Sequence, residues 1–134
     1  MLGYVGNSDT LLLSEDITNI YDYAFKNCND LQKIIIPDSV VSIGEYAFAN
    51  CDNLTEFVFG ENVAMVGVNV VFDCDKLLCL YYKGAAEDWK EIAIEKPNQK
   101  LWTVKRYYYS ETKPTEKGNY WHYNEKGEMV VWGK

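Results

Sequence analysis

The sequence predicts a mainly β repeat solenoid, a right-handed coil of 23-residue units with short helical turns, followed by a C-terminal α+β cap. Three observations predict this fold. Apolar, cysteine and glycine positions superpose when the sequence is shifted by one 23-residue period, each unit contains an extended apolar stretch, and the rhythm changes after residue 82. With 134 residues, the chain is long enough for one domain rather than two.

The 23-residue period is visible in several columns at once. The superposed sets include Leu31 with Leu54 and Leu77, Cys28 with Cys51 and Cys74, and Gly44 with Gly67. Strand-like apolar triplets recur at the same offset, at 11–13, 34–36, 57–59 and more loosely 80–82. We therefore expect repeat coils over residues 1–82, with units near 8–30, 31–53, 54–76 and a partial unit at 77–82.

The unit 31–53 shows how one coil folds. Leu31, Ile34 and Ile36 are spaced so that three apolar side chains point to one side of an extended segment. A second short extended stretch ends at Gly44, which permits a sharp bend before a helical or 3₁₀ turn. Only stacked coils bury this apolar set continuously. The residues expected in the core are Leu31, Ile34, Ile36, Val40, Ile43, Ala47, Phe48 and Cys51.

The pattern L-x-x-I-x-I-P-x-x-V-x-x-I-G-x-x-A-F-x-x-C, read from Leu31 to Cys51, resembles the BspA-type (Treponema pallidum-type) leucine-rich repeat. The resemblance covers about residues 8–82, and residues 83–134 are similar to the C-terminal region that often follows such repeats in surface proteins of gut Firmicutes. It implies a leucine-rich-repeat fold, an extracellular or cell-surface location, and adhesion to host or bacterial proteins. The third unit departs from the pattern at Gly60 and at Val70–Val71.

In a leucine-rich solenoid, two columns of each strand face outward on the concave sheet. These columns are Thr10, Lys33, Glu56 and Cys79, and Leu12, Ile35, Val58 and Tyr81. The second column is apolar throughout, and an exposed apolar row on a soluble protein indicates a partner surface; alternatively, the row supports packing between strands. The candidate partner-binding residues are Lys33, Ile35, Glu56, Val58 and Tyr81.

The C-terminal region, residues 83–134, is predicted to form a cap that is continuous with the solenoid. An amphipathic pattern predicts a helix over 85–94, followed by a strand over 101–109 and a hairpin over 120–132. All four tryptophans lie in this region. Large amphipathic rings suit the task of covering an open solenoid end.

A glycan- or cell-wall-binding module is the alternative interpretation of this aromatic-rich region. Aromatic faces stack on sugar rings, and the segment from Trp121 to Trp132 is faintly similar to cell-wall-binding repeats. However, such modules build their sites between consecutive repeats, and one copy is present here. The candidate glycan-binding residues are Tyr108, Trp121, Tyr123 and Trp132.

The four cysteines are interpreted as structural thiols. Cys28, Cys51 and Cys74 fit a column of buried, reduced small hydrophobes, because their 23-residue spacing matches no metal-binding motif. Side chains stacked in parallel also fit disulfide geometry poorly. Cys79 is expected to face outward on the sheet, where it is either exposed or covered by the C-terminal segment.

Composition and motifs exclude several classes of function. The formal net charge of −7 argues against nucleic acid and against anionic membrane surfaces, and no apolar run is long enough to insert into a membrane. A single histidine, His122, rules out sites that need two imidazoles from one chain. Neither a nucleophile elbow nor a phosphate-binding loop is present. We therefore expect no enzyme activity, catalytic residue, cofactor or metal site.

The N-terminal end raises one further expectation. Counting back one 23-residue period places Val5 opposite Cys28, so the chain begins in mid-coil. Its opening segment, MLGYVGNSDT, has neither the basic nor the apolar region of a signal peptide. These observations favour a fragment of a longer surface protein, or a chain that needs a partner at its N-terminal coil, for example by end-to-end self-association. The alternative is a small intracellular solenoid whose first six residues fold over this end.

Overall fold

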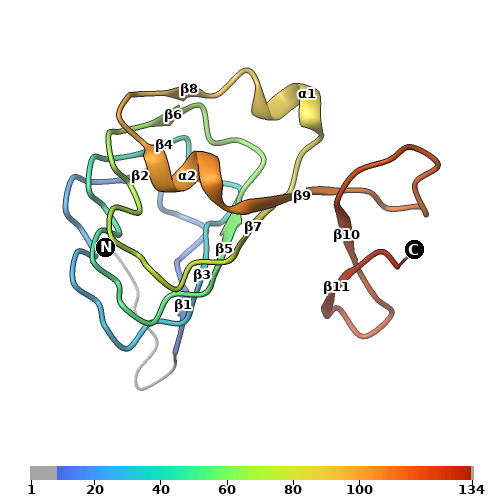
Figure 1. The fold of residues 1–134 in the computed structure, drawn as a ribbon, viewed down its shortest axis with the longest axis horizontal. Coiled ribbons are helices and arrows are strands. Elements are labelled where there is room, and N and C mark those ends of the chain that lie inside the picture. The colour runs from blue at the N-terminus through green and yellow to red at the C-terminus, as the bar shows by residue number, and fades with distance from the viewer. Residues whose placement is uncertain (1–8, 134) are drawn as a thin grey trace.

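The computed structural model describes residues 9–133 and consists of stacked coils whose strands form two β-sheets, A and B (Figure 1). Sheet A contains β1 (Thr10–Leu12), β3 (Lys33–Ile35), β5 (Glu56–Phe59), β7 (Cys79–Tyr82), β9 (Lys105–Tyr109), β10 (Tyr120–Tyr123) and β11 (Met129–Val131). Sheet B contains β2 (Asn19–Ile20), β4 (Ser42–Ile43), β6 (Met65–Val66) and β8 (Ala93–Ile94). The predicted solenoid is confirmed.

The strand register reproduces the 23-residue period. In sheet A, Leu11 pairs with Ile34 and Ile34 with Phe57 in parallel ladders. In sheet B, Ile20 pairs with Ile43 in the same way. Side chains at equivalent positions therefore stack directly on one another. The eight residues expected in the core of the unit 31–53 are all buried.

The turns between β2 and β3, and between β4 and β5, form a third set of contacts between coils. The Phe25 amide donates to the Ala47 carbonyl oxygen at 2.7 Å, and the Phe48 amide donates to the Val70 oxygen at 2.9 Å. The turns contain non-glycine residues in the left-handed region, which recur at the coil period: Tyr23, Tyr46 and Asn69, and Asn27, Asn50 and Asp73. Asn and Asp tolerate this conformation better than most residues, which accounts for the second column.

Residues 83–109 form a further coil, which is the fifth when coils are counted by the strand of sheet A that ends each one (β1, β3, β5, β7 and β9). Here the predicted elements need correction. The helix expected over 85–94 is limited to α1 (Ala86–Trp89), and the strand expected from residue 101 begins only at Lys105. Residues 93–94 form β8, which pairs with β6, and α2 (Gln99–Thr103) precedes β9. A short helix is marginal alone, so pairing with the free edge of β6 outweighs local helix propensity.

The fifth coil is longer than the others, so the 23-residue period of the sequence does not reveal it. Met65 of β6 pairs with Ala93, and Cys79 of β7 pairs with Lys105, so both partners lie further along the chain than the 23-residue period would place them. Asn98 joins this coil to the previous one. Its side-chain oxygen accepts from the Val70 amide at 3.0 Å, and its amide group donates to the Gly67 oxygen at 2.8 Å. This buried polar side chain is therefore well satisfied.

The predicted hairpin is confirmed by the antiparallel pairing of β10 with β11. β10 also pairs in parallel with β9, so the hairpin extends sheet A beyond the coils. Figure 1 shows the hairpin standing at the C-terminal end of the solenoid, with β9 leading toward it. The expectation that the chain begins within a coil, or self-associates there, concerns residues 1–8, which lie outside the described part of the chain.

Two separate apolar clusters hold the molecule together. The main core fills the interior of the coils and includes Phe25, Phe48, Phe57 and Phe59. The rings of Phe25 and Phe48 stack with their centroids 5.3 Å apart, one coil above the next. The second cluster lies on the other face of sheet A and contains Val58, Tyr81, Tyr107 and Trp121.

The four cysteines, all within the described residues, are free thiols. Cys51 and Cys74 are buried, as expected, and each thiol donates to a carbonyl oxygen of the preceding coil: Cys51 to Phe25 at 3.4 Å and Cys74 to Phe48 at 3.0 Å. The prediction was wrong for Cys28, which is only half-buried. It lies in the first described coil of the thiol column, where no described coil stacks on it from the N-terminal side.

Substitution of Gly44 tests how closely neighbouring coils approach each other. A Cβ atom at this position would lie 2.4 Å from the Asp22 backbone nitrogen, so Gly44→Ala forces the backbone to shift. We expect the free energy of unfolding to fall by about 1–3 kcal/mol, as in overpacked sites. Urea unfolding measures this, with Gly133→Ala as the control because nothing lies within 4 Å of a Cβ atom placed there. Equal stability of the two variants would contradict this packing constraint.

The thiols are predicted to differ in reactivity. In the native protein, a thiol reagent should modify Cys28 and Cys79, whereas Cys51 and Cys74 should react only after denaturation. Burial raises the pKa of the Cys28 thiol, so its reaction at neutral pH should be slow. In the native state, the Cys28→Ser and Cys79→Ser variants should each consume one equivalent of thiol reagent fewer than the unmodified protein. Reaction of more than two thiols in the folded protein would refute the assignment.

Trp121 is predicted to be the residue that holds the hairpin on sheet A. Trp121→Ala removes a fully buried ring from the second cluster, and its expected cost is about 3–5 kcal/mol of unfolding free energy. Trp102→Ala, at an exposed tryptophan of α2, is the matched control and should change stability by less than about 0.5 kcal/mol. Urea denaturation of both variants checks the difference. A small loss for Trp121→Ala would show that the hairpin is held by other contacts.

Candidate functional site

The candidate partner surface is the outer face of sheet A, the face opposite the main core. Its apolar column is only partly accessible: Leu12 is 49% exposed and Ile35 is half-buried, but Val58 is 0% and Tyr81 9% exposed. The expectation of a continuous exposed apolar row was therefore wrong at Val58 and Tyr81. These two side chains belong to the second apolar cluster, so this half of the row supports packing.

The aromatic rings of β9 and β10 account for this burial. The Tyr81 and Tyr107 rings stack with their centroids 5.1 Å apart, and the Trp121 ring meets Tyr81 edge-on at 6.0 Å. The Trp121 indole nitrogen donates to the Tyr82 carbonyl oxygen at 2.8 Å, which fixes the ring in place. Cys79, whose exposure the sequence left open, is half-buried and packs against the same cluster.

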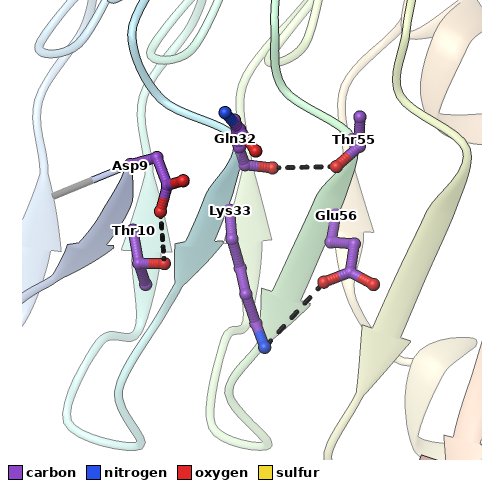
Figure 2. A network of polar contacts seen from close by, with 6 residues as sticks. All are labelled: Asp9, Thr10, Gln32, Lys33, Thr55 and Glu56. Atoms are coloured by element: carbon purple, nitrogen blue, oxygen red, sulfur yellow. Dashed lines mark hydrogen bonds and ion pairs between the residues drawn. The ribbon is translucent and has the colours of Figure 1, made fainter.

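The N-terminal half of the outer face carries polar side chains on adjacent strands. Figure 2 shows Lys33 of β3 reaching toward Glu56 of β5, with the ammonium nitrogen 3.8 Å from a carboxylate oxygen. Beside them, the Thr55 hydroxyl donates to the Gln32 carbonyl oxygen at 3.2 Å. Both charges are partly exposed, so this ion pair contributes little to stability. It is available to a partner together with Ile35.

The candidate glycan residues do not form one exposed platform. Trp121 is fully buried, so it cannot present a ring face to a sugar, and this part of the expectation was wrong. Tyr123 is exposed, while Tyr108 and Trp132 are half-buried. Tyr108 packs against the main core and is approached by the Arg106 guanidinium, whose nitrogen donates to its hydroxyl at 3.0 Å. The four residues therefore have separate structural environments.

Burial and neighbouring groups alter the acidity of two tyrosines on β7. Burial, with smaller contributions from Cys79 and Glu56, raises the pKa of Tyr81 above its usual value. Burial also raises the pKa of Tyr82 to about 12, with Asp88 and Glu61 acting in the same direction. Both side chains are therefore neutral at physiological pH, consistent with packing rather than acid–base roles.

Two residues of this surface were missed by sequence reasoning. Leu12 was placed in the outward column but not among the candidates, although it is the most exposed member of that column. Tyr107 was not singled out, although it pairs with Tyr81 across β7 and β9. Side chains alternate between the two faces of the strand predicted over 101–109, and this alternation was the available signal for Tyr107. The register of that strand with β7, however, depends on the length of the fifth coil.

Among residues 9–133, no group of three or more His, Cys, Asp or Glu side chains is placed to hold a metal ion. Among the described helices, none has the length and apolar character needed to cross a membrane.

Comparison with protein-family models agrees with the coil architecture. A family model described as a BspA type leucine rich repeat region, with six copies, matches residues 5–100. A leucine-rich cell surface protein from Faecalibacterium prausnitzii A2-165, known from a crystal structure, is similar at 18% identity and a TM-score of 0.43. The match covers 68% of this chain and 36% of that one. No curated protein matches the chain significantly. Because the family model spans well over half of the sequence, the chain belongs to the BspA-type leucine-rich repeat family.

Proposed function

We propose that the chain is a non-catalytic, protein-binding adhesion module of a bacterial secreted or cell-surface protein, which binds through the concave sheet, here the outer face of sheet A. The observation that carries the proposal is the partly exposed patch at its N-terminal half. This patch combines the apolar side chains of Leu12 and Ile35 with the Lys33–Glu56 ion pair. Apolar anchors with charged neighbours are typical of protein interfaces.

Rigidity of the sheet supports this role. Parallel pairing on both sides holds β3 and β5 in register, so Lys33, Ile35 and Glu56 keep fixed positions relative to each other. A preorganised surface loses less conformational entropy on binding. Val58 and Tyr81 lie on the same face of the sheet but are covered by the second apolar cluster, so they are assigned a supporting role rather than direct contact with the partner.

An extracellular or surface location is part of the proposal. It is supported by membership of the BspA-type family and by the description of the Faecalibacterium protein as a cell surface protein. This chain matches only 36% of the length of the Faecalibacterium protein. The adhesive activity of a longer protein is therefore part of the same proposal. The glycan-binding alternative is weakened at its central residue, because the Trp121 ring is buried.

The proposal is tested by adhesion of the full chain to a panel of immobilised host extracellular-matrix and bacterial surface proteins. Leu12→Lys and Glu56→Lys should each weaken retention on the bound protein by about tenfold or more, because they place positive charge in the patch. Met65→Lys is the matched control, since Met65 is 60% exposed on sheet B. Circular dichroism confirms that each variant is folded.

Three outcomes would overturn this assignment. One is retention that survives both patch variants but is lost with Met65→Lys, which would move the interface to sheet B. Another is the absence of retention on every protein of the panel when the unmodified chain is folded and monomeric. The third is retention lost equally in all three variants, which would indicate a general response to added charge rather than a patch.

A further inference from the structure

A cavity of about 450 Å³ lies where the connection between β9 and β10 folds beside the hairpin. Its size falls in the range of small-molecule sites. Residues from β9, from the connecting loop and from the hairpin line it together. The side chains that matter for the argument are Lys105, Lys113, Lys117, Tyr107, Tyr120 and Trp132.

The charge of this cavity is opposite to that of the chain. The described residues that line it include three lysines and one carboxylate, Glu116, whereas the whole chain has a formal net charge of −7. By contrast, the groove beside sheet B is lined by the carboxylates of Asp22, Glu45 and Glu95. The cavity at the hairpin is therefore a local concentration of positive charge, which favours an anionic ligand.

Two aromatic rings of the cavity, Trp132 and Tyr120, are half-buried, whereas Tyr107 is buried, and local contacts hold all three in place. The Trp132 indole nitrogen donates to the Ser110 carbonyl oxygen at 2.7 Å, and the His122 ring stacks on Trp132 with centroids 3.8 Å apart. The Tyr120 ring packs against the backbone of Gly118, where a Cβ atom would approach within 3.0 Å. Lys105 places its ammonium group 5.4 Å from the centre of the Tyr107 ring.

We propose that this cavity binds an acidic saccharide, a sugar ring that carries a carboxylate. The C–H face of the ring would stack on Trp132 or Tyr120, and the carboxylate would accept hydrogen bonds from the ammonium groups of Lys113 and Lys117. An inorganic anion would use the lysines alone, and a neutral sugar would use the rings alone. Only a ligand with both features uses the whole lining.

This site is independent of the protein-binding patch. The patch involves β1, β3 and β5 at one end of sheet A, whereas the cavity involves β9 and the β10–β11 hairpin at the other end. Of the residues that sequence reasoning associated with sugars, only Trp132 lines this cavity. Failure of one proposal therefore leaves the other unaffected.

The test is a calorimetric titration of the full chain with trigalacturonic acid, and with its carboxyl-reduced neutral counterpart. We expect the acid to bind, the neutral sugar to bind about tenfold more weakly or not at all, and the affinity for the acid to fall as salt is added. Lys113→Glu combined with Lys117→Glu should reduce the affinity for the acid by about tenfold or more.

The matched control is Lys90→Glu combined with Lys126→Glu, which makes the same change in net charge at exposed positions outside the cavity. This control should bind trigalacturonic acid with little change. In a ¹⁵N-labelled sample, the indole N–H signal of Trp132, identified by its loss in Trp132→Phe, should shift on titration. The indole signal of Trp102 should not shift.

Several results would overturn the proposal. Equal binding of the neutral sugar would remove the role of the carboxylate, and equal loss of affinity in both double variants would remove the role of the cavity. Tighter binding of adenosine monophosphate or of a tri-glutamate peptide, tested in parallel, would assign the cavity to another class of ligand. Absence of binding at millimolar trigalacturonic acid would also refute the site.

Discussion

Backbone hydrogen bonds join each coil to the next in sheet A, in sheet B and in the turns between the two sheets. Because the ladders of the first four coils keep one offset, every side chain lies over its equivalent in the neighbouring coil. This constraint explains the column of stacked phenylalanines, the glycine at Gly44, and thiols that donate to the preceding coil. A coil that cannot bury its own apolar side chains is stabilised by its neighbours.

The same constraint creates a problem at the C-terminal end, where stacking stops. The longer fifth coil continues both sheets, and Asn98 satisfies backbone groups of the coil before it. The hairpin then extends sheet A and places Trp121 against Tyr81. The aromatic side chains of this region therefore act first as packing groups, and Trp121 shows why ring type alone does not identify a ligand site.

Coverage by the hairpin divides the outer face of sheet A into two halves with different physical character. The half beneath Trp121 is a closed apolar cluster, and the half around Lys33 and Ile35 remains accessible. The hairpin also forms one wall of the lysine-lined cavity. One structural element thus limits the proposed protein-binding patch and contributes to the proposed saccharide site. The two proposals use different residues, at opposite ends of sheet A.

The sequence by itself determined the repeating part of this protein, because each 23-residue unit carries its own strand, turn and core positions. Burial of the eight core positions between Leu31 and Cys51 follows directly from that periodicity. Only the tertiary structure decided how residues 83–134 pack. The fifth coil does not keep the 23-residue offset of the other coils. As a result, Ala93 and Ile94 form a strand that pairs with β6, and Tyr81 pairs with Tyr107. Burial of Val58 and Trp121, like the grouping of Lys105, Lys113 and Lys117, depends on contacts between segments whose spacing has no repeat.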